Sequence, residues 1–243
     1  MRDLNTDRPD TTESPITVDA GHYQLEFSFV EYTYNKQGSN RTDGFSVMPM
    51  NLKVGLTNNI DMQLVINPYQ NNFQRQGTSS SRSTGFGDME LRTKFNIWGN
   101  DGGPTAFGIM PFIRIPSGSR GLSNNHIEGG LILPFSINEL PMGFDLTVMA
   151  EFDFVRNQNN NGYGTAFIHS ATLGHDLFSK KIHGYIEYVG IAPYQLTSTY
   201  QALLDTGVTY SLTKNIQLDM GINLGLSGGA DDFTVFIGMT YRH

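Results

Sequence analysis

The 243-residue sequence contains no cysteine, which excludes a disulfide framework and any metal site built from thiolates. It also has no run of 18 or more apolar residues, so no transmembrane helix can be assigned. Charged residues make up only 16% of the chain, and the formal net charge is −7. This acidic balance argues against a nucleic-acid partner, because nucleic-acid-binding domains are normally basic. No signal peptide is visible at the start, so we expect a mature form from which the signal peptide is absent.

The dominant pattern in the sequence is a strict alternation of apolar and polar residues from Gly21 to the C-terminus. In one segment, for example, Leu52 and Val54 alternate with Lys53. A period of two is the signature of β-strands, and no helical period of comparable strength is present. Twelve such segments occur, most of about ten residues, the length at which a tilted strand crosses a bilayer. They are centred on residues 23–29, 50–56, 61–67, 88–95, 107–114, 128–136, 145–153, 170–174, 183–188, 204–209, 217–224 and 233–242.

The connections between these segments alternate in length. Tight turns are expected at residues 57–59, 179–181 and 213–215, with somewhat longer ones at 99–104 and 138–143. Larger polar loops are expected at residues 36–43, 70–84, 117–125 and 156–163. An even number of strands with short turns at one end and long loops at the other is typical of a bacterial barrel with both chain ends in the periplasm. We therefore predict two parts: residues 1–20, a periplasmic or lumen-plugging segment, and residues 21–243, a barrel.

Alternation alone leaves open which face is buried, because a soluble barrel or sandwich also alternates. Three features favour lipid on the apolar side. The polar faces are rich in Gly, Ser, Thr and Asn and carry less charge than a soluble surface usually does. Aromatic residues such as Trp98, Phe107 and Tyr241 gather near strand ends, as in interfacial girdles. Charges of both signs adjoin between Asp88 and Lys94, which suits a wet lumen better than lipid. The predicted fold is an all-β, closed antiparallel transmembrane barrel of about 12 strands in the bacterial outer membrane.

The inward face predicted in this way carries most of the strand charges. The expected lumen-lining residues are Glu26, Lys53, Asp61, Asp88, Glu90, Arg92, Lys94, Arg114, Glu128, Asp145, Glu151, Asp153, Glu187, Asp205, Asp219 and Arg242. Acidic members outnumber basic ones, so an open lumen would favour cations. The alternative is a network of ion pairs that holds a narrow barrel together, and we favour that role for most of these residues. In particular, we expect Arg92, Lys94 and Arg114 to pair across neighbouring strands, with Glu90, Glu128 and Glu151 as partners.

Two further groups of residues are candidates outside the strands. Arg8, Pro9 and Asp10 are the most distinctive residues of the N-terminal segment, which we expect to be a plug of the lumen or a cover of its mouth, with a disordered leader as the alternative. Arg75 and Arg82 belong to a predicted outer loop and could form bidentate pairs with lipopolysaccharide phosphates. The alternative there is that these arginines only keep the loop soluble.

Enzyme functions find little support in the sequence. The six histidines are scattered and show no zinc-binding spacing. His169 and Ser170 are neighbours on a strand, so they face opposite sides and cannot form a nucleophile–base pair. We expect no catalytic residue, no metal and no cofactor.

Several stretches resemble a known family. The opening TDRPDTTESP (residues 6–15) with GHYQLE (21–26) is similar to the mature start of outer-membrane proteins labelled for the meta-pathway of phenol degradation. The stretches GFGD (85–88), LRTK (91–94), QLD (217–219) and GMTYR (238–242) are similar to later strands of that family, and the similarity covers nearly the whole chain. The resemblance implies passage of aromatic compounds across the outer membrane. Such barrels usually end on Phe, which the barrel-assembly machinery reads; here Tyr241 or His243 would supply the terminal aromatic ring.

Two functional classes remain after these steps. The first is an outer-membrane, porin-like channel or transporter for small, aromatic or hydrophobic molecules. The second is a structural or interaction barrel with a closed lumen. The expected partners are outer-membrane lipid, lipopolysaccharide, the barrel-assembly machinery and a small hydrophobic substrate.

Overall fold

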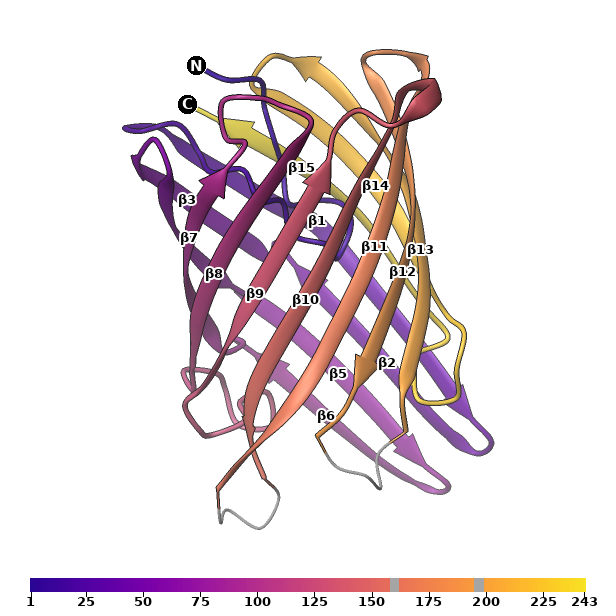
Figure 1. The fold of residues 1–243 in the computed structure, drawn as a ribbon. Helices are drawn as coiled ribbons and strands as arrows, with labels where there is room; N and C mark the ends of the chain where they lie inside the picture. Colours follow the sequence, from indigo (N-terminus) through magenta and orange to yellow (C-terminus); the bar gives the residue numbers. More distant parts are fainter. Residues whose placement is uncertain (158–161, 195–198) are drawn as a thin grey trace.

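The computed structural model describes residues 1–157, 162–194 and 199–243. In this part of the chain, fifteen strands form one antiparallel sheet that closes on itself through the pairing of β15 with β1 (Figure 1). The strands are β1 (Tyr23–Gln37), β2 (Asn40–Val47), β3 (Met50–Thr57), β4 (Ile60–Ile66), β5 (Tyr69–Gln76), β6 (Ser79–Gly85), β7 (Met89–Trp98), β8 (Thr105–Ile115), β9 (Glu128–Ile137), β10 (Phe144–Arg156), β11 (Tyr163–Ser179), β12 (Ile182–Ala192), β13 (Gln201–Thr213), β14 (Ile216–Gly225) and β15 (Phe233–Arg242). A single 3₁₀ turn, Pro141–Gly143, precedes β10.

Three of the barrel's crossings are interrupted part-way, which reconciles fifteen strands with twelve crossings. β2 and β3 are separated by Met48 and Pro49, β4 and β5 by Asn67 and Pro68, and β6 and β7 by residues 86–88. Proline has no N–H to donate to a neighbouring strand, which fits the breaks in the ladder at Pro49 and Pro68. Opposite the first break, β1 has a bulge between Ser28 and Val30 and pairs with β3 before the bulge and with β2 after it. The barrel therefore has the twelve crossings that the sequence predicted.

The prediction of outer loops at residues 36–43 and 70–84 was largely wrong. They form two hairpins, β1–β2 and β5–β6, that extend the barrel at the end away from the chain termini (Figure 1). Their side chains are polar on both faces, so the alternation that marks a half-apolar strand is missing. Strand pairing needs only backbone groups, so strands that continue the barrel sheet into water pair without this alternation. The predicted loop at 117–125 lies outside the strands, and part of the loop at 156–163 falls outside the described residues.

Side-chain exposure shows the two faces of the wall. Outward-facing Leu52 and Val54 are 38% and 40% exposed, whereas Lys53 between them is 2% exposed. A barrel with apolar side chains outside and charged ones buried inside matches lipid, not water, as its surroundings. Aromatic rings meet around the end that carries the tight turns and the termini, where Trp98 lies 5.0 Å from Phe107 and Phe144 stacks on His175 at 4.6 Å. In the described residues no helix has the length and apolar character needed to cross a membrane.

The lumen is not polar throughout. Met110, Phe112, Ile132 and Met149 form a buried apolar cluster on the inner face of β8–β10. The rest of the space is occupied largely by the N-terminal segment, which enters from the end of the barrel where both termini lie (Figure 1). We call this end the turn end, and the opposite end the loop end.

Candidate functional site

The N-terminal segment enters and leaves the lumen at the same place. The backbone N–H of Arg2 donates to Asp19 at 3.1 Å, and the Arg2 side chain donates to the carbonyl of Thr17 at 3.0 Å. Arg242 at the end of β15 lies 3.7 Å from the Asp19 carboxylate. These contacts join the two ends of the segment, so residues between them form a loop that projects into the barrel.

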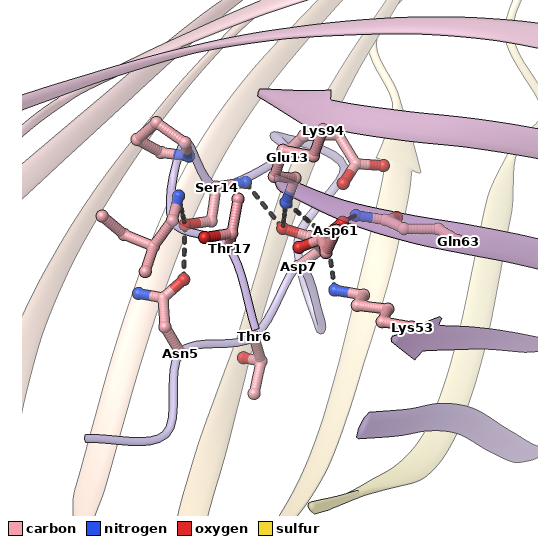
Figure 2. A network of polar contacts seen from close by, with 12 residues as sticks. Asn5, Thr6, Asp7, Glu13, Ser14, Thr17, Lys53, Asp61, Gln63 and Lys94 are labelled. Atoms are coloured by element: carbon pink, nitrogen blue, oxygen red, sulfur yellow. Dashed lines mark hydrogen bonds and ion pairs between the residues drawn. The ribbon is translucent and has the colours of Figure 1, made fainter. Parts of the chain in front are cut away.

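One side of that loop contacts a group of cations, which we call the cationic wall: Lys53 on β3, and Arg92 and Lys94 on β7. The Asp7 carboxylate pairs with Lys53 and also lies 2.8 Å from the Lys94 ammonium (Figure 2). The N–H of Ser14 donates to the same carboxylate at 2.8 Å. Burial alone would raise the pKa of Asp7, but the charges of Lys53 and Lys94 outweigh it and hold the pKa well below its usual value. Asp7 therefore stays ionised in the lumen.

Glu13 is the second carboxylate of the segment on this side, and it pairs with Arg92. Burial, reinforced by the negative charge of Asp7, raises the pKa of Glu13 from 4.5 to about 7 despite that partner. Arg92 is shared, because its guanidinium also donates to Glu90. The sequence flagged neither Asp7 nor Glu13. The signal that could have found them is the excess of inward cations on β3 and β7, which requires acidic partners.

The opposite side of the loop contacts what we call the acidic wall: Glu187 on β12, Asp205 on β13 and Asp219 on β14. The backbone N–H groups of Thr11 and Thr12 each donate to Glu187 at 2.8 Å. β11–β14 contain no Lys or Arg. The positive partner comes from the segment itself.

Arg8 is that partner. It donates to both oxygens of Asp219, at 2.7 and 3.3 Å, and its guanidinium lies over the ring of Phe236 at 5.4 Å. A bidentate pair of this kind fixes the geometry as well as the charge. The other two residues singled out with Arg8 lie beside it, since Pro9 and Asp10 line the same cavity. Burial and the nearby Glu187 raise the pKa of Asp10 well above its usual value.

Inward-facing glycines leave room for the segment. A Cβ atom at Gly55 on β3 would lie 2.1 Å from the Asp19 carbonyl oxygen, and one at Gly238 on β15 would lie 2.3 Å from the Arg8 guanidinium. At Gly108 on β8 it would lie 3.1 Å from Pro15. The backbone of the segment thus approaches the wall closely at positions where no side chain intervenes.

The remaining predicted lumen residues divide into two sets. The first set contacts the segment. Glu26 accepts from the Asp7 N–H at 3.2 Å, Asp61 accepts from the Val18 N–H at 3.0 Å, and Arg242 donates to the carbonyl of Arg2 at 3.0 Å.

The expected cross-strand pairs form in part. Arg114 lies 2.8 Å from Glu90 and 3.6 Å from Glu128. Lys94, in contrast, bonds Asp7 of the segment.

The second set contacts other parts of the chain. Asp88 falls between β6 and β7, where it accepts from the N–H groups of Gly118 and Asn124 and so holds the loop that follows β8. Glu128 accepts from the Arg156 N–H at 2.9 Å. Asp145 lies 3.6 Å from His183 near the turn end. Glu151 and Asp153 lie on the inner face of β10, where one Asp153 oxygen is buried without a hydrogen-bond partner.

Among the described residues, two cavities of the lumen lie directly beside the segment. The larger, about 370 Å³, lies at the turn end against β9–β14 and is lined mostly by polar groups, including Asp145, Thr172 and Gln217. The smaller, about 190 Å³, lies farther toward the loop end, against β1, β3, β4 and β7. Its lining includes Glu26 and Arg92.

The other candidates from the sequence lie in different parts of the barrel. Arg75 and Arg82 are exposed on the β5–β6 hairpin, where Arg82 lies 5.7 Å over the ring of Phe73. Ser170 faces inward and its hydroxyl lies 2.6 Å from that of Thr12, whereas His169 contacts Tyr200 at 3.2 Å. The His243 ring lies 5.2 Å from Tyr23 on β1.

Comparison with known proteins places this geometry in a family. The family described as "Putative MetA-pathway of phenol degradation" matches residues 6–243. The chain belongs to this family. The match includes the lumen-filling segment from Thr6 onward together with the whole barrel, so the two are parts of one family unit. No curated protein sequence matches the chain.

Solved structures share the barrel at low sequence identity. An outer membrane channel from Pseudomonas putida F1 is 12% identical with a TM-score of 0.64, covering 98% of this chain and 100% of that one. The translocator domain of the autotransporter NalP from Neisseria meningitidis is 12% identical with a TM-score of 0.56, covering 93% and 90%. The transport unit of the autotransporter AIDA-I from Escherichia coli is 13% identical with a TM-score of 0.52, covering 90% and 89%. These likenesses establish the fold.

Proposed function

We propose that this member of the phenol-degradation family is a channel of the bacterial outer membrane for small molecules, closed by residues 1–20 in the state described. The observation that carries the proposal is the position of the segment, bonded on one side to the cationic wall and on the other to the acidic wall. A segment that only covered the periplasmic mouth would not need partners on opposite sides of the lumen. The name of the Pseudomonas putida relative, an outer membrane channel, supports the same role.

A small aromatic compound is the substrate class we propose. The family description points to phenol degradation. The larger cavity, about 370 Å³, falls within the range of roughly 300–1,000 Å³ that is usual for small-molecule sites. Its polar lining offers partners for a hydroxyl group, and the apolar cluster around Met110 and Met149 lies on the same inner surface. Uptake of radiolabelled phenol into proteoliposomes, compared with that of a sugar of similar size, tests this choice.

A closed structural barrel is the second candidate. It is favoured by the ion pairs among Arg92, Arg114 and Glu90, which connect β7 and β8 inside the lumen without help from the segment. In that case, removing the segment would leave the lumen blocked.

Deletion of residues 2–16 separates the two candidates. We expect the deletion variant to show a large increase in single-channel conductance in planar bilayers, and a variant in which the same residues are replaced by a Gly-Ser linker of equal length to do the same. The matched control is Arg41→Ala, which removes a charge on the β1–β2 hairpin and should leave conductance at the wild-type value. Unchanged conductance in both segment variants, with folded barrels shown by heat-modifiable mobility, would reject the plugged channel in favour of the structural barrel.

The outer hairpins suggest a lipid partner. We propose that Arg75 and Arg82 on β5–β6 contact lipopolysaccharide phosphates, because both are exposed and neither belongs to a salt bridge among the described residues. The double variant Arg75→Ala/Arg82→Ala should bind lipopolysaccharide more weakly in a co-purification assay. Equal binding by wild type and variant would remove this contact from the proposal.

A further inference from the structure

Arg8 occupies a unique place between the two cavities of the lumen. Among the described residues, it is the only one that lines both the cavity of about 370 Å³ at the turn end and the cavity of about 190 Å³ farther in. Neighbouring residues of the segment lie on one side or the other: Pro9 and Asp10 line the first cavity, and Asp7 and Glu13 the second. The Arg8 side chain therefore forms part of the partition between them.

The partition is fixed on the wall side. The Asp219 carboxylate that receives Arg8 has no solvent-exposed side-chain area, whereas the Arg8 side chain itself is 18% exposed. Phe236 supports the guanidinium from its ring face, and Gly238 leaves the space it fills. Each of these contacts is made by a residue of β14 or β15, so strands other than those of the cationic wall hold the Arg8 side chain.

The charge of Arg8 matters as much as its volume. In the described part of the chain, Arg8 is the only Lys or Arg in a salt bridge with the acidic wall. Without it, Glu187, Asp205 and Asp219 would face the lumen with no arginine or lysine opposite them. A narrow pore lined by carboxylates attracts small cations and excludes anions.

We propose that the Arg8–Asp219 pair is the gate between the two cavities and the residue pair that sets the charge selectivity of the lumen. This inference rests on the proposed function, because a gate has meaning only if the lumen conducts once the segment moves. With the pair intact, Arg8 separates the cavities and neutralises Asp219. When Arg8 withdraws, the cavities join along the acidic wall, and the path so formed favours small cations.

The first test is Arg8→Ala in planar bilayers under a potassium chloride gradient. We expect a severalfold rise in conductance and a shift of the reversal potential toward the potassium equilibrium potential. Arg8→Lys, which keeps the charge on a side chain without the bidentate fork, should fall between wild type and Arg8→Ala. The control is Arg41→Ala, which removes another bidentate Arg–Asp pair, with Asp43, on an outer hairpin. It should leave both measurements unchanged.

Two further variants separate a gate from general loosening of the segment. Arg92→Ala breaks the pair with Glu13. Because the Arg92 side chain lines only the smaller cavity, we expect a smaller change in conductance and selectivity than for Arg8→Ala. Asp219→Asn keeps the volume of the partition and leaves Arg8 positive, so selectivity should shift toward anions. Equal effects of Arg92→Ala and Arg8→Ala, or a cation shift in Asp219→Asn, would overturn the inference.

Failure of the gate differs from failure of the channel. If the deletion of residues 2–16 conducts strongly and Arg8→Ala behaves as wild type, the channel stands and the gate is refuted. If the deletion variant also fails to conduct, both fall together.

Discussion

The cationic wall on β3 and β7 and the acidic wall on β12–β14 hold the same segment through different chemistry. At the cationic wall, the contacts are between acidic and basic side chains, Asp7 with two lysines and Glu13 with Arg92. At the acidic wall, the contacts come from two backbone N–H groups, the hydroxyls of the same two threonines, and Arg8. A backbone N–H is present in every residue except proline, so this wall depends less on side-chain identity. The segment should therefore be more sensitive to substitution on its Asp7 side than at Thr11 or Thr12.

The largest effect is expected from Asp7→Ala. The substitution leaves Lys53 and Lys94 buried with one fewer carboxylate, and breaking a buried pair in this way costs about 3–5 kcal/mol. If the segment docks as one unit, hydrogen exchange of the Thr11 and Thr12 amides, on the opposite wall, should accelerate by about a hundredfold or more. Asp3→Ala, at an exposed position, is the control and should leave exchange unchanged. Acceleration confined to residues near Asp7 would show that the walls hold the segment independently.

The second-largest effect is expected in the pH dependence of the free energy of unfolding, to which Glu13 at the cationic wall contributes. Because burial raises the pKa of Glu13 from 4.5 to about 7, the folded protein retains a proton on this group that the unfolded chain loses. The contribution of Glu13 to stability is present below about pH 4.5 and is lost as the pH rises to about 7. At about 1.4 kcal/mol per pKa unit, the loss is roughly 3 kcal/mol.

Glu13→Gln should remove this part of the pH dependence. The free energy of unfolding in urea, followed by fluorescence of the single tryptophan, Trp98, gives the measurement at pH 5 and pH 7.5. Glu139→Gln, on an exposed connection, is the matched control. A difference between the two pH values that is the same in wild type and Glu13→Gln would assign the effect to other groups.

A substitution at a glycine that the segment approaches closely should reduce stability less than the loss of a buried charge. In Gly55→Ala the new Cβ would lie 2.1 Å from the Asp19 carbonyl oxygen, so β3 or the base of the segment must shift. Overpacking of this kind costs about 1–3 kcal/mol. The urea experiment measures it, with Gly228→Ala as the control, because a Cβ there meets no atom within 4 Å. Equal stability of the two variants would mean that the segment does not rest against β3.

The smallest effect is expected at the acidic wall. Thr12→Val removes the hydroxyl that contacts Ser170 and Glu187 but keeps the N–H that donates to Glu187. The loss of a neutral hydroxyl's hydrogen bonds costs about 1 kcal/mol. Exchange of the Thr11 amide should accelerate by roughly tenfold or less, while Thr78→Val, on the exposed outer hairpin, leaves it unchanged. An acceleration as large as that of Asp7→Ala would contradict the expected difference between the two walls.

The barrel itself was predictable in most of its crossings. Alternation such as that around Lys53 marks a strand and assigns its faces at once, because one face must meet lipid and the other the lumen. The β5–β6 hairpin was missed for the same physical reason, since its residues meet water on both faces and nothing forces their side chains to alternate. The breaks near Pro49 and Pro68 were visible as prolines, but their alignment in neighbouring strands is a matter of register, which residues far apart in sequence decide.

The lumen was predictable only in part. The inward charges Lys53, Lys94 and Asp219 followed from the period of two, but their partners did not. Lys94 was expected to pair with a neighbouring strand, and Asp7 supplies its partner from 87 residues earlier in the chain. A segment without periodicity gives no indication of the direction of its side chains.

The N-terminal segment separates what the sequence determined from what only the tertiary structure decided. By itself the sequence determined the strands, the outward apolar face, the charged inward face and the presence of a polar segment with Arg8, Pro9 and Asp10, because each of these is written in local residue order. Only the closed barrel decided which wall each charge of that segment meets, since closure brings β7 and β13 to opposite sides of one narrow space. Arg8 became the partition between two cavities in that space through a carboxylate 211 positions away.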